Sequence, residues 1–264
     1  MPVYDIHAHV YPDAIAARAA DAIGRFYELP MEGDGTAEGL LKRSRAAGIS
    51  RSVIHSAAVT PDKVTRINDF LSRTAAAHPE ELTAFGTLHP GLEDAEAEAD
   101  RMIALGLKGV KLHPDFQHFE LDCPAALRMF HVLAERDLPV LIHVGDYRYT
   151  WSAPERMARV LKEVPRLKAV CAHMGGWSLW NEGWKVLAGL ENARCDCSSS
   201  LYALEPEKAA EILRHWGTER VFFGTDFPMW DPVGELERFM ALPLTDTERE
   251  RILWKNLREY LDLP

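Results

Sequence analysis

Short apolar runs alternate along the chain with longer segments of helical periodicity, and this alternation restricts the fold more than any other feature. The runs occupy residues 3–9, 52–57, 83–89, 109–113, 140–144, 168–173, 193–198 and 221–226. Amphipathic segments lie between them, at residues 61–77, 94–105, 124–136, 154–163 and 205–216. Eight strands, each followed by a helix at about 33 residues per unit, predict a single (β/α)8 TIM barrel of the α/β class over residues 1–264. A doubly wound sheet also alternates strands and helices, but the glycine-rich turns of its nucleotide sites are absent from the sequence.

The composition and charge of the chain restrict the cellular compartment and the classes of binding partner that we expect. A formal net charge of −10 argues against nucleic acid and anionic membranes, because both require a basic surface. No apolar segment approaches the roughly 20 residues that span a bilayer, and the first residues do not resemble a secretory signal. The four cysteines are too few for a disulfide scaffold in a chain of this length. We expect a cytoplasmic protein that acts on a small molecule, and leave homodimer formation open.

Titratable residues recur at the ends of the predicted strands. They are His7, His9, His89, Lys111, His113, His143, His173 and Asp226. The C-terminal ends of barrel strands form one face, so these side chains should converge there. A strand sends residues i and i+2 to the same side, and His7 and His9 should therefore project together.

Four of these residues, His7, His9, His143 and Asp226, are predicted to bind a divalent metal ion. Imidazole nitrogens and a carboxylate suit zinc, or another divalent ion such as manganese. The metal would make a bound water acidic, and Asp226 is placed to accept its proton. The alternatives are a hydrogen-bonded core histidine at His143 and a helix cap at Asp226. Under these alternatives, several unrelated titratable residues would have to occur by chance at equivalent strand ends.

Two further strand-end groups bear on the number of metal ions. Gly175 and Gly176 follow His173 and allow a ligand to approach the backbone closely. We assign His173 to acid–base catalysis in preference to metal binding. A carboxylated Lys111 would bridge two ions, with His173 on the second. We expect an unmodified, charged Lys111 and one ion.

The substrate should contact residues beside these strand ends. The candidates are Lys111, His113, Arg148, Trp151 and Trp177. The longest connections, residues 10–36 and 145–154, are predicted to be loops that select the substrate. No positional argument gives His55 a role.

Six short motifs together resemble the amidohydrolase superfamily, and most closely its amidohydrolase-related (type 2) branch, which contains aminocarboxymuconate-semialdehyde decarboxylase and various hydrolases. The motifs are Asp5-Ile6-His7-Ala8-His9, Gly109-Val110-Lys111-Leu112-His113-Pro114, Ile142-His143, Ala172-His173-Met174-Gly175-Gly176, Phe223-Gly224-Thr225-Asp226-Phe227-Pro228 and Lys255-Asn256-Leu257. The resemblance covers nearly the whole chain. It implies a barrel with a divalent metal, usually zinc, held by His7, His9, His143 and Asp226, and with His173 as acid or base. We expect no β-sandwich before the barrel, which favours the compact type 2 branch.

These residues predict a metal-dependent hydrolase that cleaves an amide, lactone or ester bond of a small, carboxylated metabolite. The alternative is a metal-dependent, non-oxidative decarboxylase of a small unsaturated or aromatic carboxylic acid. In that reaction His173 would handle the proton at the carbon that loses CO2. A third interpretation is a non-catalytic metal-binding barrel.

Overall fold

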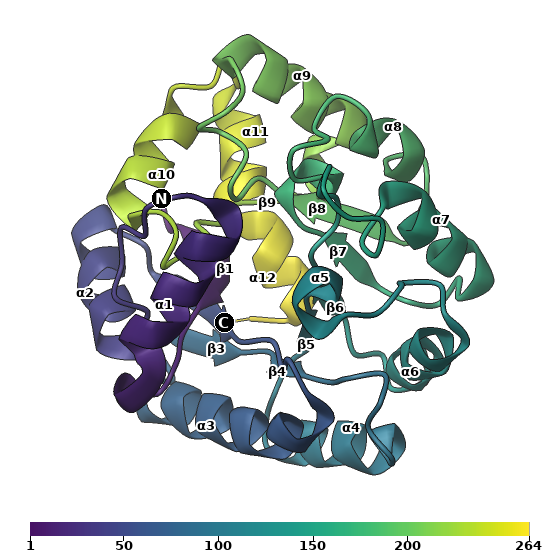
Figure 1. Ribbon diagram of the computed structural model, residues 1–264. Coiled ribbons are helices and arrows are strands. Elements are labelled where there is room, and N and C mark those ends of the chain that lie inside the picture. The colour runs from purple at the N-terminus through teal and green to yellow at the C-terminus, as the bar shows by residue number, and fades with distance from the viewer. Residues whose placement is uncertain (264) are drawn as a thin grey trace.

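The computed structural model describes residues 1–263 as a barrel of parallel strands inside a ring of helices (Figure 1). The strands are β1 (Tyr4–His9), β2 (Arg51–His55), β3 (Leu82–Ala84), β4 (Gly86–Thr87), β5 (Val110–Leu112), β6 (Val140–Ile142), β7 (Ala169–Cys171), β8 (Ala193–Asp196) and β9 (Val221–Phe222). β3 and β4 are two parts of one barrel strand that is interrupted at Phe85. The strands of residues 1–263 therefore fill the eight predicted positions, and the predicted fold is confirmed.

Parallel pairing runs around the barrel and returns to its first strand. Neighbouring strands pair in register, for example Val110 with Val140 and Leu141 with Val170. The last strand position closes on β1, where the Ile6 N–H donates to the Phe223 carbonyl at 3.0 Å. The closed sheet places the C-terminal ends of all strands on one face.

Helices surround the strands, and five of them confirm the predicted helical segments. They are α1 (Asp13–Tyr27), α2 (Ala37–Ala47), α3 (Val64–Ala77), α4 (Ala95–Ala104), α5 (Pro114–Gln117), α6 (Pro124–Glu135), α7 (Pro154–Glu163), α8 (Gly183–Leu187), α9 (Pro206–Trp216), α10 (Pro232–Met240), α11 (Asp246–Glu250) and α12 (Asn256–Leu261). α6, α7 and α9 each begin with a proline. Proline has no backbone N–H, and no hydrogen bond is lost at this position because the first N–H of a helix has no partner within the helix. No helix in the described range 1–263 is both long and apolar enough to cross a membrane.

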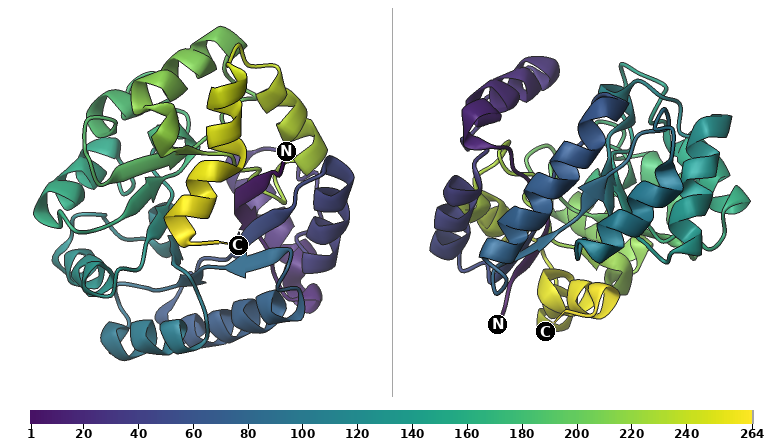
Figure 2. Two further views of the ribbon diagram at one scale, coloured as in Figure 1. Left: turned by 180° about the vertical axis from the view of Figure 1, so that it is seen from behind. Right: turned by 90° about the horizontal axis from the view of Figure 1, so that it is seen from below.

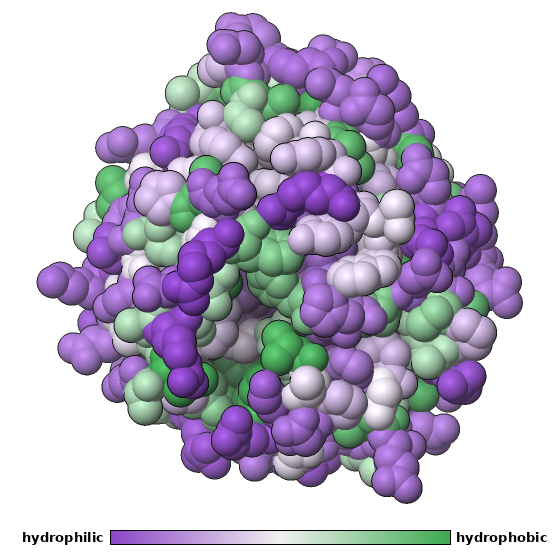
Figure 3. All heavy atoms as spheres, viewed as in Figure 1, coloured by the Kyte–Doolittle hydropathy of each residue, from purple (hydrophilic) through white to green (hydrophobic). Residues whose placement is uncertain are grey.

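The connection after β1 differs from the predicted loop, because residues 13–27 form α1. Its alanine-rich sequence favours a helix, with Asp13 in the first turn and Arg25 in the last. Only Ala16 and Ala20 of this helix are buried, so α1 lies over the barrel rather than within its core. Figure 2 shows α1 at the opposite end of the barrel from both termini. The surface is hollowed between α1 and α5 (Figure 3).

The barrel interior is apolar at its N-terminal end and polar at its C-terminal end. Tyr4 and Ile6 pack into an interior cluster with Val53, Phe85, Leu141 and Val170, which α12 closes from below. Ala8 and Val10 pack instead into the layer between strands and helices. The β1–β2 register shifts between Asp5 and Ala8. Because of this irregularity, the even-numbered residues of β1 face the barrel interior before it and the odd-numbered residues after it. It directs His7 and His9 into the upper interior.

Candidate active site

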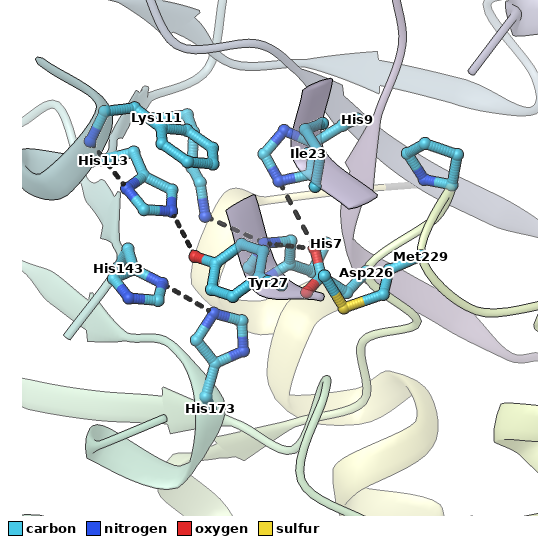
Figure 4. A pocket seen from close by; sticks show the side chains of 12 residues that line it. His7, His9, Ile23, Tyr27, Lys111, His113, His143, His173, Asp226 and Met229 are labelled. Carbon is cyan, nitrogen blue, oxygen red and sulfur yellow. Dashed lines mark hydrogen bonds and ion pairs between the residues drawn. The ribbon is translucent and has the colours of Figure 1, made fainter. Parts of the chain in front are cut away.

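A small cavity lies at the C-terminal ends of the strands (Figure 4). Seven of the eight predicted strand-end groups line it, together with side chains of α1, α5 and the segment after β9. The lining residues are His7, His9, Ile23, Tyr27, Lys111, His113, Phe116, His143, His173, Asp226, Pro228 and Met229. The exception is His89, which lies outside and is hydrogen-bonded by the Gly91 N–H at 3.0 Å.

His7 and His9 each place a ring nitrogen beside the carboxylate of Asp226. The Oδ1 of Asp226 lies 3.3 Å from the Nε2 of His7 and 3.4 Å from the Nε2 of His9. Ligands about 2.1 Å from a tetrahedral metal lie about 3.4 Å from one another, which matches the distance of each histidine nitrogen from the Asp226 oxygen. All three side chains are buried. The donor set therefore fits a divalent cation.

Asp196 on β8 fixes the orientation of the His7 ring. Its Oδ2 accepts a hydrogen bond from the His7 Nδ1 at 2.8 Å, so the His7 Nε2 keeps its lone pair toward the cavity. Burial, and then the charge of Lys111, lower the pKa of His7 well below its usual value, so the ring is neutral. The Oδ1 of Asp196 accepts the backbone N–H groups of His173 and Ser198, each at 3.0 Å. A carboxylate behind a histidine is the arrangement that orients metal ligands in proteins.

Asp226 is held in an uncommon backbone conformation. Its φ of 60° lies in the left-handed region, and its N–H donates to the His7 carbonyl at 2.7 Å. The Ser199 hydroxyl donates to its Oδ2. Although burial acts in the opposite direction, the neighbouring His7 and His9 rings hold the pKa of Asp226 well below its usual value. Asp226 is thus an ionised carboxylate aimed at the histidines, whereas Asp231 caps α10.

His143 and His173 face each other through ring nitrogens. The His173 Nε2 lies 3.1 Å from the His143 Nδ1. Carbonyl oxygens accept hydrogen bonds from the other nitrogens, Gly145 from His143 at 2.7 Å and Ser198 from His173 at 3.0 Å. Burial is the main cause that lowers the pKa of both rings, which favours their neutral forms. Two lone pairs then point at each other, and a shared proton or metal ion would stabilise this arrangement.

Lys111 places an amine beside His7. Its Nζ donates to the His7 Nε2 at 2.9 Å, and its side chain is fully buried. Burial lowers the pKa of Lys111 to about 8, although Asp226 and Asp196 act in the opposite direction. A cation bound at the His7 Nε2 would displace this hydrogen bond. The amine would then be free to bind an anionic group of a substrate.

Tyr27, the last residue of α1, closes one side of the cavity. Its hydroxyl lies 2.8 Å from the Nε2 of His113. The His113 ring is stacked between Phe116 and His143, with ring centroids 3.8 Å and 4.0 Å apart. His113 therefore lines the cavity, its Nε2 covered by Tyr27, and its role in substrate binding stays a prediction.

Three predicted substrate-binding residues lie outside the cavity wall. The guanidinium of Arg148 is bound by both carboxylate oxygens of Asp146, at 2.9 Å and 2.7 Å, so its charge is already paired. Trp151 packs against His118 and Tyr149 instead of the cavity. Trp177 is separated from the cavity by Tyr27, and its ring centroid lies 4.7 Å from that of Tyr27. The sequence placed these residues in a loop or beside glycines, but it did not reveal what lies between them and the strand ends.

The sequence interpretation missed three residues of the site. Asp196 lies between two buried cysteines, and the alternation of a strand could have shown that it faces the other way. His55 ends β2, and its ring packs edge-on against His9 and His7, with centroids 4.5 Å and 5.0 Å away. The strand-end argument applied to His55 as well. No pattern in the sequence pointed to Tyr27, because residues 10–36 were interpreted as a loop.

Residues 4–263 match the family described as amidohydrolase. The chain belongs to the amidohydrolase family. The match spans every strand of the barrel and all the residues that line the cavity. No curated protein sequence matches the chain.

Solved structures share the fold over the full length of this amidohydrolase-family chain. An uncharacterised TIM-barrel protein from Bordetella bronchiseptica is 22% identical, with a TM-score of 0.83 and 99% of each chain covered. A dihydroxybenzoic acid decarboxylase from a Polaromonas species, with bound manganese and the inhibitor 2-nitroresorcinol, is 16% identical, with a TM-score of 0.75. That alignment covers 99% of this chain and 97% of the other. A 5-carboxyvanillate decarboxylase from Sphingomonas paucimobilis is 16% identical, with a TM-score of 0.73 and coverage of 100% and 99%.

Proposed function

We propose that this amidohydrolase-family protein is a metal-dependent, non-oxidative decarboxylase of a small aromatic or unsaturated carboxylic acid. Two of the similar structures are decarboxylases of aromatic acids, and one of them holds manganese. They support the decarboxylation alternative better than the predicted hydrolysis of an amide, lactone or ester. Within this chain, the proposal is carried by the spacing of the His7 Nε2 and His9 Nε2 around the Asp226 Oδ1.

We assign the metal ligands as His7, His9, His143 and Asp226. The ion is manganese or zinc, and the manganese in the similar dihydroxybenzoic acid decarboxylase favours the former. One ion is expected, as the sequence analysis predicts for an unmodified Lys111. A bound divalent ion would orient the substrate by its oxygen atoms and stabilise the negative charge that builds up as the carboxylate leaves.

The remaining residues bind the acid and supply a proton. Loss of CO2 breaks the bond to the carboxylate carbon and leaves its electron pair on the neighbouring carbon, which must then take up a proton. His173 takes up a proton from solvent at its Nε2 and passes it to that carbon; this nitrogen faces the His143 Nδ1 at 3.1 Å, and the ring lines the cavity. Lys111 and His113 bind the anionic end and a polar substituent of the substrate. The closed wall formed by Tyr27 keeps water from the reacting carbon.

The test measures CO2 release from a panel of hydroxybenzoic acids by the manganese-loaded protein, alongside hydrolysis of aryl esters, lactones and amides. We expect CO2 from at least one acid, loss of that activity with a chelator, and its return with manganese. The rate should fall roughly a hundredfold or more in Asp226→Asn and stay unchanged in Asp21→Asn, a matched change at an exposed position of α1. Hydrolysis without any CO2 release would overturn the proposal. A protein that binds metal but turns over no compound would support the non-catalytic barrel.

A further inference from the structure

An apolar groove lies beneath α1, next to the cavity that holds the histidines. It has a volume of about 320 Å³. One wall is α1, with Ala19, Ala22, Ile23 and Phe26, and the opposite wall includes Ala57 and Val59 after β2. Figure 3 shows hydrophobic side chains at the hollow between α1 and α5. A volume of this size is in the range of small-molecule sites.

The groove borders the metal-site cavity. His9, Ile23 and Phe116 line both spaces, so the groove begins at one of the predicted metal ligands. The cavity itself is polar, since its wall is mostly histidine together with Lys111 and Asp226. A molecule with an anionic end and an apolar end would match the two spaces in that order.

The apolar wall of the groove is open to solvent. Val59 is 42% exposed, and Ala22 also lies at the surface. Phe26 and Ile23 are only partly buried. When a ligand covers such a surface, water is released from it, and each methylene group that becomes buried increases the binding constant about fourfold.

We infer that this groove is a subsite for an apolar substituent of the substrate, an alkyl or aryl group distant from the reacting carboxylate. The inference rests on the proposed function, because it assigns the acid to the neighbouring cavity. It narrows the substrate class to carboxylic acids that carry such a substituent. A small-molecule occupant is favoured because the groove leads inward to His9 rather than along the outer surface.

The test compares the binding of benzoate and 4-butylbenzoate to the purified protein by isothermal titration calorimetry. 4-Butylbenzoate should bind roughly tenfold tighter or more than benzoate. Ala22→Phe fills the groove from α1, and Val59→Asp places a charge on the opposite wall. Each should reduce the preference for 4-butylbenzoate to about twofold or less while the affinity for benzoate is retained.

Ala17→Phe is the matched control, since Ala17 is exposed on the same helix and does not line the groove. The preference should persist in this variant. An equal affinity of the two probes for the unmodified protein would overturn the inference, as would a preference that survives both Ala22→Phe and Val59→Asp. The test measures no turnover. A failure of decarboxylation alone would therefore appear in the CO2 assay and leave this result unchanged.

Discussion

The Nε2 of His173 lies 3.1 Å from the Nδ1 of His143, although both rings already donate their other N–H to backbone carbonyls. Neutral rings in these tautomers present two lone pairs to the same point. The contact therefore requires a proton or a metal ion between the rings, and substitutions distinguish which of them it holds.

Replacement of the two histidines should have different effects on metal content. His143→Gln should weaken manganese binding roughly tenfold or more, because it removes a proposed ligand. His173→Gln should keep the metal but lower kcat roughly a hundredfold or more, since it removes the proton donor. Elemental analysis after loading and gel filtration measures the first effect, and steady-state kinetics the second. Loss of metal from His173→Gln would show that His173 is itself a ligand.

Substitution of Asp196 should weaken metal binding, although Asp196 itself does not contact the metal. In Asp196→Asn an amide faces the His7 Nδ1 and disfavours the tautomer that turns the Nε2 lone pair to the cavity. Manganese affinity should fall roughly 10–100-fold. Titration calorimetry with manganese measures this change, and Asp21→Asn provides the control. An unchanged affinity in Asp196→Asn would remove this residue from the account.

The sequence predicted the barrel and the meeting point of its strand-end residues because both depend on local patterns. Apolar runs separated by amphipathic segments define the strands, and a barrel forces the strand ends together. His7, Lys111 and Asp226 line one cavity for this reason, although 219 residues separate the first from the last.

Contacts between the loops could not be predicted from the sequence. Arg148 had the charge to bind a carboxylate, but its pairing with Asp146 and its bond to the Phe26 carbonyl depend on how α1 lies over the barrel. Tyr27 covers the cavity for the same reason. The position of α1 is set by packing and not by a local pattern, so neither role could be read from residues 10–36 alone.

Arg148 should therefore matter for stability more than for substrate binding. Arg148→Ala leaves the buried Asp146 carboxylate without its partner and should lower the free energy of unfolding by roughly 1–3 kcal/mol. Its KM should change by less than about threefold, whereas Lys111→Met should raise KM roughly tenfold or more. Urea unfolding and kinetics measure the two effects. A large rise in KM in a stable Arg148→Ala would restore the predicted role of Arg148 in substrate binding.

Glu235 should make the folded state less stable as the pH rises. Burial raises its pKa from 4.5 to about 7 although Arg238 is nearby, and its Oε2 has no hydrogen-bond partner within residues 1–263. Because the pKa is higher in the folded state, this contribution is complete below about pH 4.5 and is lost as the pH rises through 7. The loss is on the order of 3 kcal/mol. Urea unfolding at pH 5 and pH 8 should show a smaller difference in Glu235→Gln than in the unmodified protein, and equal differences would contradict the assignment.

The most direct test of the metal centre is an anomalous difference map, recorded at the manganese edge from crystals of the manganese-loaded protein. One peak is expected within bonding distance of the His7 Nε2, the His9 Nε2 and the Asp226 Oδ1, with His143 as the fourth protein ligand. Lys111 should no longer be hydrogen-bonded to His7. A peak away from these atoms, or no peak in loaded crystals, would contradict the proposed metal centre.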